Sequence, residues 1–260
     1  MIACLEFILW VFRFFMGACV FSFINVVICR LPRGESVVKG RSHCMECGHE
    51  LAAKELIPLV SYIGLGGKCS QCGVHIPIRD FMVECTGGAA FVLCAVFYGI
   101  GKTGVISLRG LLVFLFLAVL MAVAVIDWDT HIIYDRFHMM IGILGAAAVW
   151  LFPEISLISR LIGLLIISVP MLVLAIAIPG AFGGGDIKLM AVCGWLLGWK
   201  ANVFAMFAGL LTAGLYCGVM LAKKKLGRKD HFAFGPFLAI GLAIAAFCGE
   251  WIGNWYLSLL

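Results

Sequence analysis

Eight apolar runs separated by short polar segments leave this chain of 260 residues few ways to fold outside a membrane. Hydrophobic residues make up 63% of it and charged residues 13%, with a mean hydropathy of +1.11, well outside the range of soluble domains. Runs of about 18 or more apolar residues with few charges predict transmembrane helices. The runs cover residues 4–29, 82–100, 104–126, 137–152, 156–178, 187–199, 202–222 and 234–258.

These runs predict an all-α polytopic membrane protein with about eight transmembrane helices. The runs 137–152 and 187–199 are short, so seven spans remain an alternative in which one of them is re-entrant. Run 4–29 is too long for a signal peptide and no small-residue cleavage site follows it, so we expect an uncleaved anchor. The chain then divides into a first transmembrane helix (1–29), a polar loop (30–81) and a helical bundle (82–260).

The distribution of lysines and arginines predicts how the chain is oriented in the membrane. With the N-terminus outside, fourteen lysines and arginines, including those of the run 223–229, fall in inside segments and four fall in outside segments. Basic loops stay in the cytoplasm, so we expect the loop 30–81 and the polar ends at Asp127 and Asp186 to face the cytoplasm. These basic loops suit the anionic headgroups of a lipid bilayer rather than nucleic acid.

The loop 30–81 contains two CxxC pairs, Cys44 with Cys47 and Cys69 with Cys72. Two such pairs complete a tetrahedral thiolate site, and four thiolates leave no open position, so we predict structural zinc. A metal would supply the folding free energy that so small a loop lacks. Disulfides are disfavoured in a reducing cytoplasm, and the nearby His43, His49 and His75 are alternative ligands, although solvated loop histidines are the simpler interpretation.

Two aspartates lie where the chain leaves the apolar runs. Asp127 directly follows the run 104–126, and Asp186 closes a Gly-Gly-Gly-Asp segment before the next helix. The glycines permit close approach of another segment, and a helix N-terminus stabilises a carboxylate. Two neighbouring carboxyls can share one proton and activate a water, as in aspartic peptidases. Taken singly, each is equally well explained as an interfacial loop or a helix cap.

With these residues in view, the chain resembles the bacterial type IV prepilin leader peptidases, a family of membrane aspartic endopeptidases. The resemblance extends over nearly the whole chain as an ordered set of segments. These are Ser22 to Ile28 with Arg30-Leu31-Pro32, both CxxC pairs, Ile57 to Tyr62, Gly67-Lys68-Cys69, Val83-Glu84, Ile126-Asp127, Gly183 to Lys188, and Phe234 to Gly241.

The resemblance implies a catalytic pair, Asp127 and Asp186, and prepilin or pseudopilin substrates with a short basic leader. It implies a location in the bacterial inner membrane with the active site on the cytoplasmic side. It also implies N-methylation of the new N-terminus with S-adenosylmethionine, for which the sequence identifies no cofactor-binding residue. The oligomeric state and the pilin-like system served stay open.

The chain departs from the family pattern at two positions. Tyr134 replaces the usual proline before Asp135, and Phe21 replaces the usual glycine before Ser22. Three alternatives compete with the prepilin peptidase: a non-enzymatic scaffold that uses the zinc loop, a transporter, and an intramembrane protease of the presenilin type. Few ionisable residues lie in the spans, which disfavours a transporter. The zinc loop and Phe234-Gly235-Pro236 disfavour the presenilin type.

Overall fold

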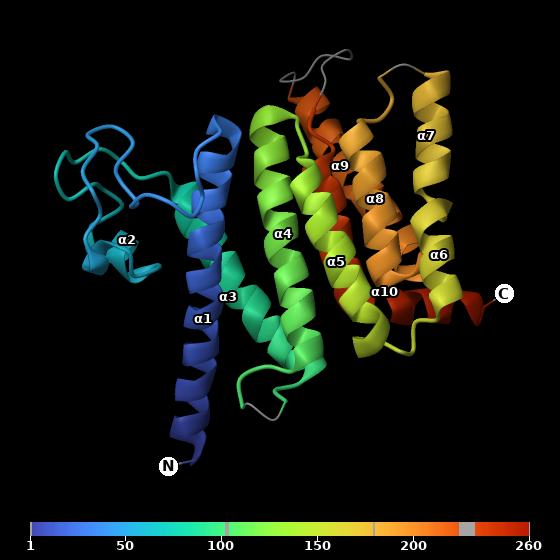
Figure 1. Cartoon of the computed structure of the whole chain (residues 1–260), viewed down its shortest axis with the longest axis horizontal. Coiled ribbons are helices and arrows are strands. Elements are labelled where there is room, and N and C mark those ends of the chain that lie inside the picture. The colour runs from blue at the N-terminus through green and yellow to red at the C-terminus, as the bar shows by residue number, and fades with distance from the viewer. Residues whose placement is uncertain (1, 102–103, 179, 224–231, 260) are drawn as a thin grey trace. The chain divides into compact units, whose positions relative to one another are not determined.

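The computed structural model is helical and describes residues 2–101, 104–178, 180–223 and 232–259 (Figure 1). It divides into two compact units, Met1–Ala118 and Val119–Leu260, and the boundary falls inside one helix. The helices are α1 (Ile2–Arg30), α2 (Val60–Gly64), α3 (Ile78–Tyr98), α4 (Leu108–Thr130), α5 (Asp135–Leu151), α6 (Leu157–Ile166), α7 (Ser168–Ala177), α8 (Gly184–Leu197), α9 (Trp199–Ala222) and α10 (Gly235–Leu257), with 3₁₀ turns at Leu31–Arg33 and Ala53–Glu55.

In the first unit, α1 packs along α3. Phe21 of α1 is 1% exposed and lies over Gly87 of α3, where an added Cβ would approach the Phe21 ring to 2.2 Å. The large side chain on one helix therefore fits because the facing residue on the other has none. This packing accommodates the departure at Phe21, since the bulk it adds is matched by a glycine opposite.

In the second unit, α10 packs along α9, and α8 packs against α5, α6 and α9. The side chain of Arg160 on α6 is fully buried between the C-terminal ends of α5 and α8. Its guanidinium donates to the carbonyl oxygens of Ala148 and Phe152 at the end of α5, and of Trp195 and Leu196 at the end of α8. Carbonyls in the last turn of a helix have no partner within it, so one arginine satisfies two helix ends.

Six helical segments of the described residues are long and apolar enough to cross a membrane, which makes this a multi-pass membrane protein. They correspond to α1, α3, α4, α6 with α7, α9 and α10. The predicted runs 137–152 and 187–199 form α5 and α8, with 17 and 14 residues. At about 1.5 Å per residue both fall short of the roughly 30 Å hydrocarbon core. The prediction of eight spans is thus not confirmed for these two.

Two predictions, the orientation from basic residues and the division of the chain into three parts, stay predictions. Most of the basic run 223–229 lies outside the described residues, as does Lys102. The division into a first helix, a loop and a bundle remains a prediction, because the compact units follow a different boundary, at Ala118 within α4.

Candidate active site and metal centre

Asp127 lies in the last turn of α4 and is 5% exposed. Its Oδ2 accepts a hydrogen bond of 2.9 Å from the backbone N–H of Gly235, the first residue of α10. The N–H of Gly235 is free to point at the carboxylate because the first N–H groups of a helix have no partner within it, and Pro236 follows within the first two helical positions. The acid at the end of α4 and the Gly-Pro start of α10 therefore form one contact.

Asp186 lies in the first turn of α8 and is 9% exposed. Its Oδ1 is buried without a hydrogen-bond partner. The preceding Gly185 faces Ile133, in the turn after α4, so closely that a Cβ on Gly185 would meet the Ile133 Cβ at 2.9 Å. The glycine thus lets the start of α8 lie against the segment that follows Asp127.

The structure brings Asp127 and Asp186 to the same end of the second unit. The C-terminal end of α4 and the N-terminal ends of α8 and α10 point the same way in Figure 1. The rings of Phe182 and Phe234, which precede α8 and α10, lie 5.9 Å apart and join the two helix starts. The two carboxyls are close enough for their charges to repel each other. Two mutually repelling, buried carboxyls favour a state in which one is protonated.

Three further side chains connect α5 to the start of α8. His138 is 6% exposed; its Nε2 lies 3.1 Å from the carbonyl oxygen of Gly185, and its Nδ1 lies 3.2 Å from Asp135 Oδ1. Lys188 donates to the same Asp135 oxygen at 2.8 Å. The Lys188 ammonium and the His138 ring hold the pKa of the Asp135 carboxyl below its usual range. This cluster fixes the peptide that directly precedes Asp186.

Tyr134, which stands where the family usually has proline, precedes α5 with φ −74° and ψ 137°. Proline is confined to φ near −65°, so the tyrosine adopts a backbone that proline would also adopt. Its ring packs on Phe137 at 6.5 Å. The substitution therefore leaves the path of the turn between Asp127 and α5 unchanged.

The four cysteines of the loop form a compact cluster in the first unit. The sulfurs of Cys44, Cys47, Cys69 and Cys72 all lie within 4.8 Å of one another. The Cys44–Cys72 and Cys47–Cys69 sulfur pairs are 3.9 Å apart, too far for disulfide bonds of about 2.05 Å. Such a set can hold a metal ion. No histidine belongs to the cluster, so the alternative ligands are not supported among the described residues.

Each CxxC pair folds as a knuckle. The N–H of Gly48 donates to the carbonyl of Cys44, and the N–H of Gly73 donates to that of Cys69, at 2.9 and 3.0 Å. Both glycines have φ of 71°, a left-handed conformation that glycine adopts at little cost. The repeated geometry explains why a glycine follows the second cysteine of each pair.

The surroundings of the cluster shift the pKa values of Cys69 and Cys72 in opposite directions. Backbone N–H groups of Cys72 and Gln71 lower the pKa of Cys69 to about 6. The pKa of Cys72 rises to about 12: the N–H of Val74 favours its thiolate, but burial and hydrogen bonds with the other cysteines outweigh that effect. The Cys69 thiol is therefore ready to bind a cation near neutral pH, and metal binding would displace the proton of Cys72.

Sequence reasoning proposed both aspartates and all four cysteines as candidates, and it did not single out His138, Arg160 or the donor role of Gly235. His138 stands three residues after Asp135, a helical spacing that places both side chains on one face. That spacing was the sequence signal from which the contact between His138 and Asp135 could have been predicted. Nothing in the sequence indicates that Arg160 reaches the ends of α5 and α8, because those contacts depend on how the helices cross.

A helical membrane bundle with two buried carboxyls at one end has the groups that a membrane aspartic peptidase requires. Residues 15–98 match the family model described as the bacterial peptidase A24 N-terminal domain, and residues 114–218 match the type IV leader peptidase family. The chain belongs to the type IV leader peptidase family.

Curated relatives carry the name prepilin leader peptidase/N-methyltransferase. The protein from Bacillus subtilis (strain 168) is 31% identical over 97% of this chain and 98% of its own length. Those from Dichelobacter nodosus and Pseudomonas aeruginosa are 33% and 30% identical, over 90% and 94% of this chain and 89% and 91% of their own lengths. No solved structure matches the chain.

Proposed function

We propose that this protein is an aspartic endopeptidase that removes the short basic leader of prepilin-like proteins at the cytoplasmic face of the bacterial inner membrane. Asp127 and Asp186 are its catalytic pair. The observation that supports this most is their meeting at one end of the second unit, both buried, from elements 59 residues apart along the chain. Prepilins and pseudopilins are the substrates, as the names of the relatives indicate.

The environments of the two carboxyls assign their roles. Asp127 accepts a hydrogen bond from Gly235, which stabilises its charged form. Asp186 accepts a hydrogen bond from the backbone N–H of Gly183, but its Oδ1 is buried without a partner, and leaving a buried charge incompletely paired costs several kcal/mol. The helix N-terminus favours an anion there by only about 0.3–1 kcal/mol. Desolvation therefore prevails, so that Asp186 holds the shared proton and Asp127 is the carboxylate.

The reaction follows from this assignment. A water between the two carboxyls loses a proton to Asp127 as it attacks the scissile carbonyl, whose oxygen is polarised by the proton on Asp186. The tetrahedral intermediate collapses when the leaving amine takes a proton from the pair. No covalent bond to the enzyme forms, and the pair finishes with one proton, as it began.

We infer that the metal held by Cys44, Cys47, Cys69 and Cys72 is zinc in a structural role. Tetrahedral coordination with zinc–sulfur bonds of about 2.3 Å separates neighbouring sulfurs by about 3.8 Å. The 3.9 Å separations of the two cross-pairs fit that value. With four cysteines as ligands the ion has no position for water, so it stabilises the loop and takes no part in peptide hydrolysis.

We further propose that the enzyme methylates the new N-terminus with S-adenosylmethionine, since the relatives are named N-methyltransferases as well as peptidases. When bound, this donor would supply an electrophilic methyl group to the new N-terminal amine. This second activity is distinct from hydrolysis and needs a binding site of its own.

The proposal is tested with the detergent-purified protein and a prepilin that carries a basic leader. Mass spectrometry of the product should show loss of the leader and, with the methyl donor present, a further gain of about fourteen daltons. Asp127→Asn and Asp186→Asn should each abolish leader removal while keeping the wild-type melting temperature. Substantial cleavage by either variant would sink the assignment, and a scaffold would show no cleavage by any form.

A further inference from the structure

An aromatic cluster lies next to Asp127 in the second unit. The ring of Trp128, the residue after Asp127, lies 5.7 Å from the ring of Tyr216 on α9 and 6.5 Å from that of Phe237 on α10. Tyr216 and Phe237 are 5.2 Å apart, and Phe232 lies 5.8 Å from Phe237. We call these four residues the aromatic cluster. It joins α4, α9 and α10 beside the candidate active site.

Two members of the cluster are close neighbours of the groups that hold the acid in place. Trp128 directly follows Asp127, and Phe237 comes two residues after Gly235, whose N–H binds the Asp127 carboxylate. An extended peptide advances about 3.3 Å per residue. A side chain one or two residues from a scissile bond at this carboxylate can therefore reach the cluster.

The cluster is only partly covered by the rest of the protein. Trp128 is 49% exposed and Phe232 is 37% exposed, whereas Phe237 is 6% exposed and contacts the other three rings. Val219, one turn after Tyr216 on the same face of α9, is also exposed. The rings thus leave apolar surface uncovered, and this surface continues along α9, one of the helices long and apolar enough to cross a membrane.

The part of the site formed by α5 and the start of α8 has a different character. There Asp135 contacts both His138 and Lys188, so the groups on that side are charged or polar. All four members of the aromatic cluster are uncharged. An uncharged aromatic surface gains free energy by covering apolar side chains and gains none from a hydrated charge. The cluster therefore suits the part of a substrate that is not its basic leader, which is the part after the scissile bond.

We propose that the aromatic cluster is the subsite for the first side chain after the scissile bond and selects a bulky apolar or aromatic residue there. The inference rests on the peptidase proposed above. Trp128 is the specificity-determining residue, because it is the member nearest Asp127 in the chain and half of its surface is free to cover a ligand. A small side chain at that position would leave the indole ring uncovered and lose the contact.

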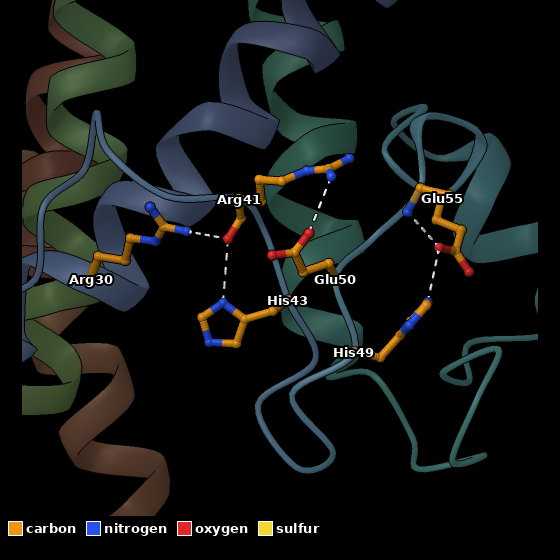
Figure 2. A network of polar contacts seen from close by, with 7 residues as sticks. Arg30, Arg41, His43, His49, Glu50 and Glu55 are labelled. Carbon is orange, nitrogen blue, oxygen red and sulfur yellow. Dashed lines mark hydrogen bonds and ion pairs between the residues drawn. The ribbon is translucent and has the colours of Figure 1, made fainter.

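The basic leader is the competing occupant, because aromatic faces also attract cations. Carboxylates are the stronger partners of lysine and arginine, and exposed carboxylates lie outside the cluster. The exposed side chain of Asp135 pairs with Lys188, and that of Glu50, in the loop of the first unit, pairs with Arg41 (Figure 2). These observations favour the residue after the scissile bond, and the experiment below separates the two occupants.

The test compares two prepilins that differ only in the residue after the scissile bond, phenylalanine or alanine. The ratio of their kcat/KM values is measured with detergent-purified wild type, Trp128→Ala and Trp128→Phe. The matched control is Trp150→Ala, because Trp150 is an exposed tryptophan near the end of α5 and outside the cluster. Melting temperatures of all four proteins are compared. A tryptophan that only anchors the protein at the membrane surface would not affect this ratio.

We expect the wild type to prefer the phenylalanine substrate by at least about tenfold, as an apolar subsite does. Trp128→Ala should reduce that preference to within about threefold, and Trp128→Phe should keep most of it because an aromatic face remains. Trp150→Ala should match the wild type. A wild type without the preference, or a Trp128→Ala variant that keeps it, overturns the proposal.

A third prepilin, with the basic residues of its leader replaced by glutamine, separates the two occupants. Wild type and Trp128→Ala should respond equally to this loss of leader charge. If Trp128→Ala instead removes the dependence on leader charge and keeps the preference for phenylalanine, the leader occupies the cluster and the proposal is wrong.

A second measurement does not depend on cleavage. The photoreactive p-benzoylphenylalanine replaces the residue after the scissile bond, and this prepilin is irradiated with the Asp186→Asn variant. Crosslinks should map to Trp128, Tyr216 or Phe232, and crosslinks confined to other segments would overturn the proposal. Failure of the proposed peptidase is a separate result: the crosslinks would map to the cluster while the wild type releases no leader.

Discussion

At the residue scale, Gly235 serves the Asp127 carboxylate in two ways. Its N–H donates to Oδ2, and its lack of a side chain leaves room for that oxygen, since a Cβ there would lie 2.6 Å from it. Real Cβ atoms do not approach that closely, so any larger residue must displace the acid. The sequence marks Gly235 as a helix start, and the structure adds that it bounds the candidate active site.

Gly235→Ala should therefore lower the rate of leader removal by about 10²-fold, the usual cost of moving a reacting group by an ångström. The melting temperature should change little. Gly214→Ala is the control, because nothing lies within 4 Å of a Cβ at that position on α9. Kinetics of the two variants on one prepilin substrate check this. Equal rates in both would show that the Gly235 contact does not position Asp127.

His138 acts on Asp186 through the peptide before it. Both atoms facing its ring nitrogens, the Gly185 carbonyl oxygen and the Asp135 carboxylate, are acceptors. Glutamine places an amide N–H near the position of Nε2, whereas asparagine reaches only that of Nδ1. We expect His138→Gln to retain kcat within about threefold and His138→Asn to lose about tenfold, an effect of roughly 1.4 kcal/mol, with KM unchanged in both.

Equal melting temperatures of these two variants would assign the difference to positioning rather than to folding. If His138→Asn cleaves as fast as His138→Gln, the bond to Gly185 has no role in placing Asp186.

At the scale of elements, the two knuckles and the short helices of the 30–81 loop depend on the cluster between them. Among the described residues, the 3₁₀ turn Ala53–Glu55 and the five-residue α2 are the helical parts between the CxxC pairs. Such short helices are unstable alone. The metal proposed for the cluster would join both knuckles and so contribute most of the order in this loop.

Removing the metal should unfold this loop while leaving the membrane helices intact. We expect about one zinc ion per wild-type chain by elemental analysis, and none in Cys44→Ser. Amide hydrogen exchange in residues 42–76 should rise by several orders of magnitude in that variant, because structural zinc contributes about 10–16 kcal/mol in small domains. The control is Cys4→Ser, an exposed cysteine of α1 outside the cluster. Unchanged exchange in metal-free protein would contradict the structural role.

The elements also show what sequence can and cannot provide. The period and length of the apolar runs predict the helices, and the CxxC spacing predicts the cysteine cluster. Helices and CxxC turns can be predicted because each depends on residues that are close together in the chain. The shortness of α8 agrees with the short apolar run 187–199, whereas the break at Ile167 between α6 and α7 was not anticipated. The exact ends of α8 depend on packing, because the helix begins at the glycines beside Ile133 and ends where Arg160 donates to its carbonyls.

At the scale of the whole molecule, the two groups of candidate functional residues lie in different compact units. The second contains both aspartates, and the first contains the cysteine cluster. The pairing of Asp127 with Gly235, 108 residues later, could not be read from the chain, because it depends on how α4 and α10 meet.

The central claim is that Asp127 and Asp186 act as one unit on one water. The most direct test is a double-mutant cycle of leader removal with Asp127→Asn, Asp186→Asn and the double variant. Residues that share one step lose nearly all activity singly and little more together. We predict a loss of about 10⁴-fold or more in each single variant and no further loss in the double. Losses that multiply, or a single variant that cleaves at a tenth of the wild-type rate or faster, would contradict the account.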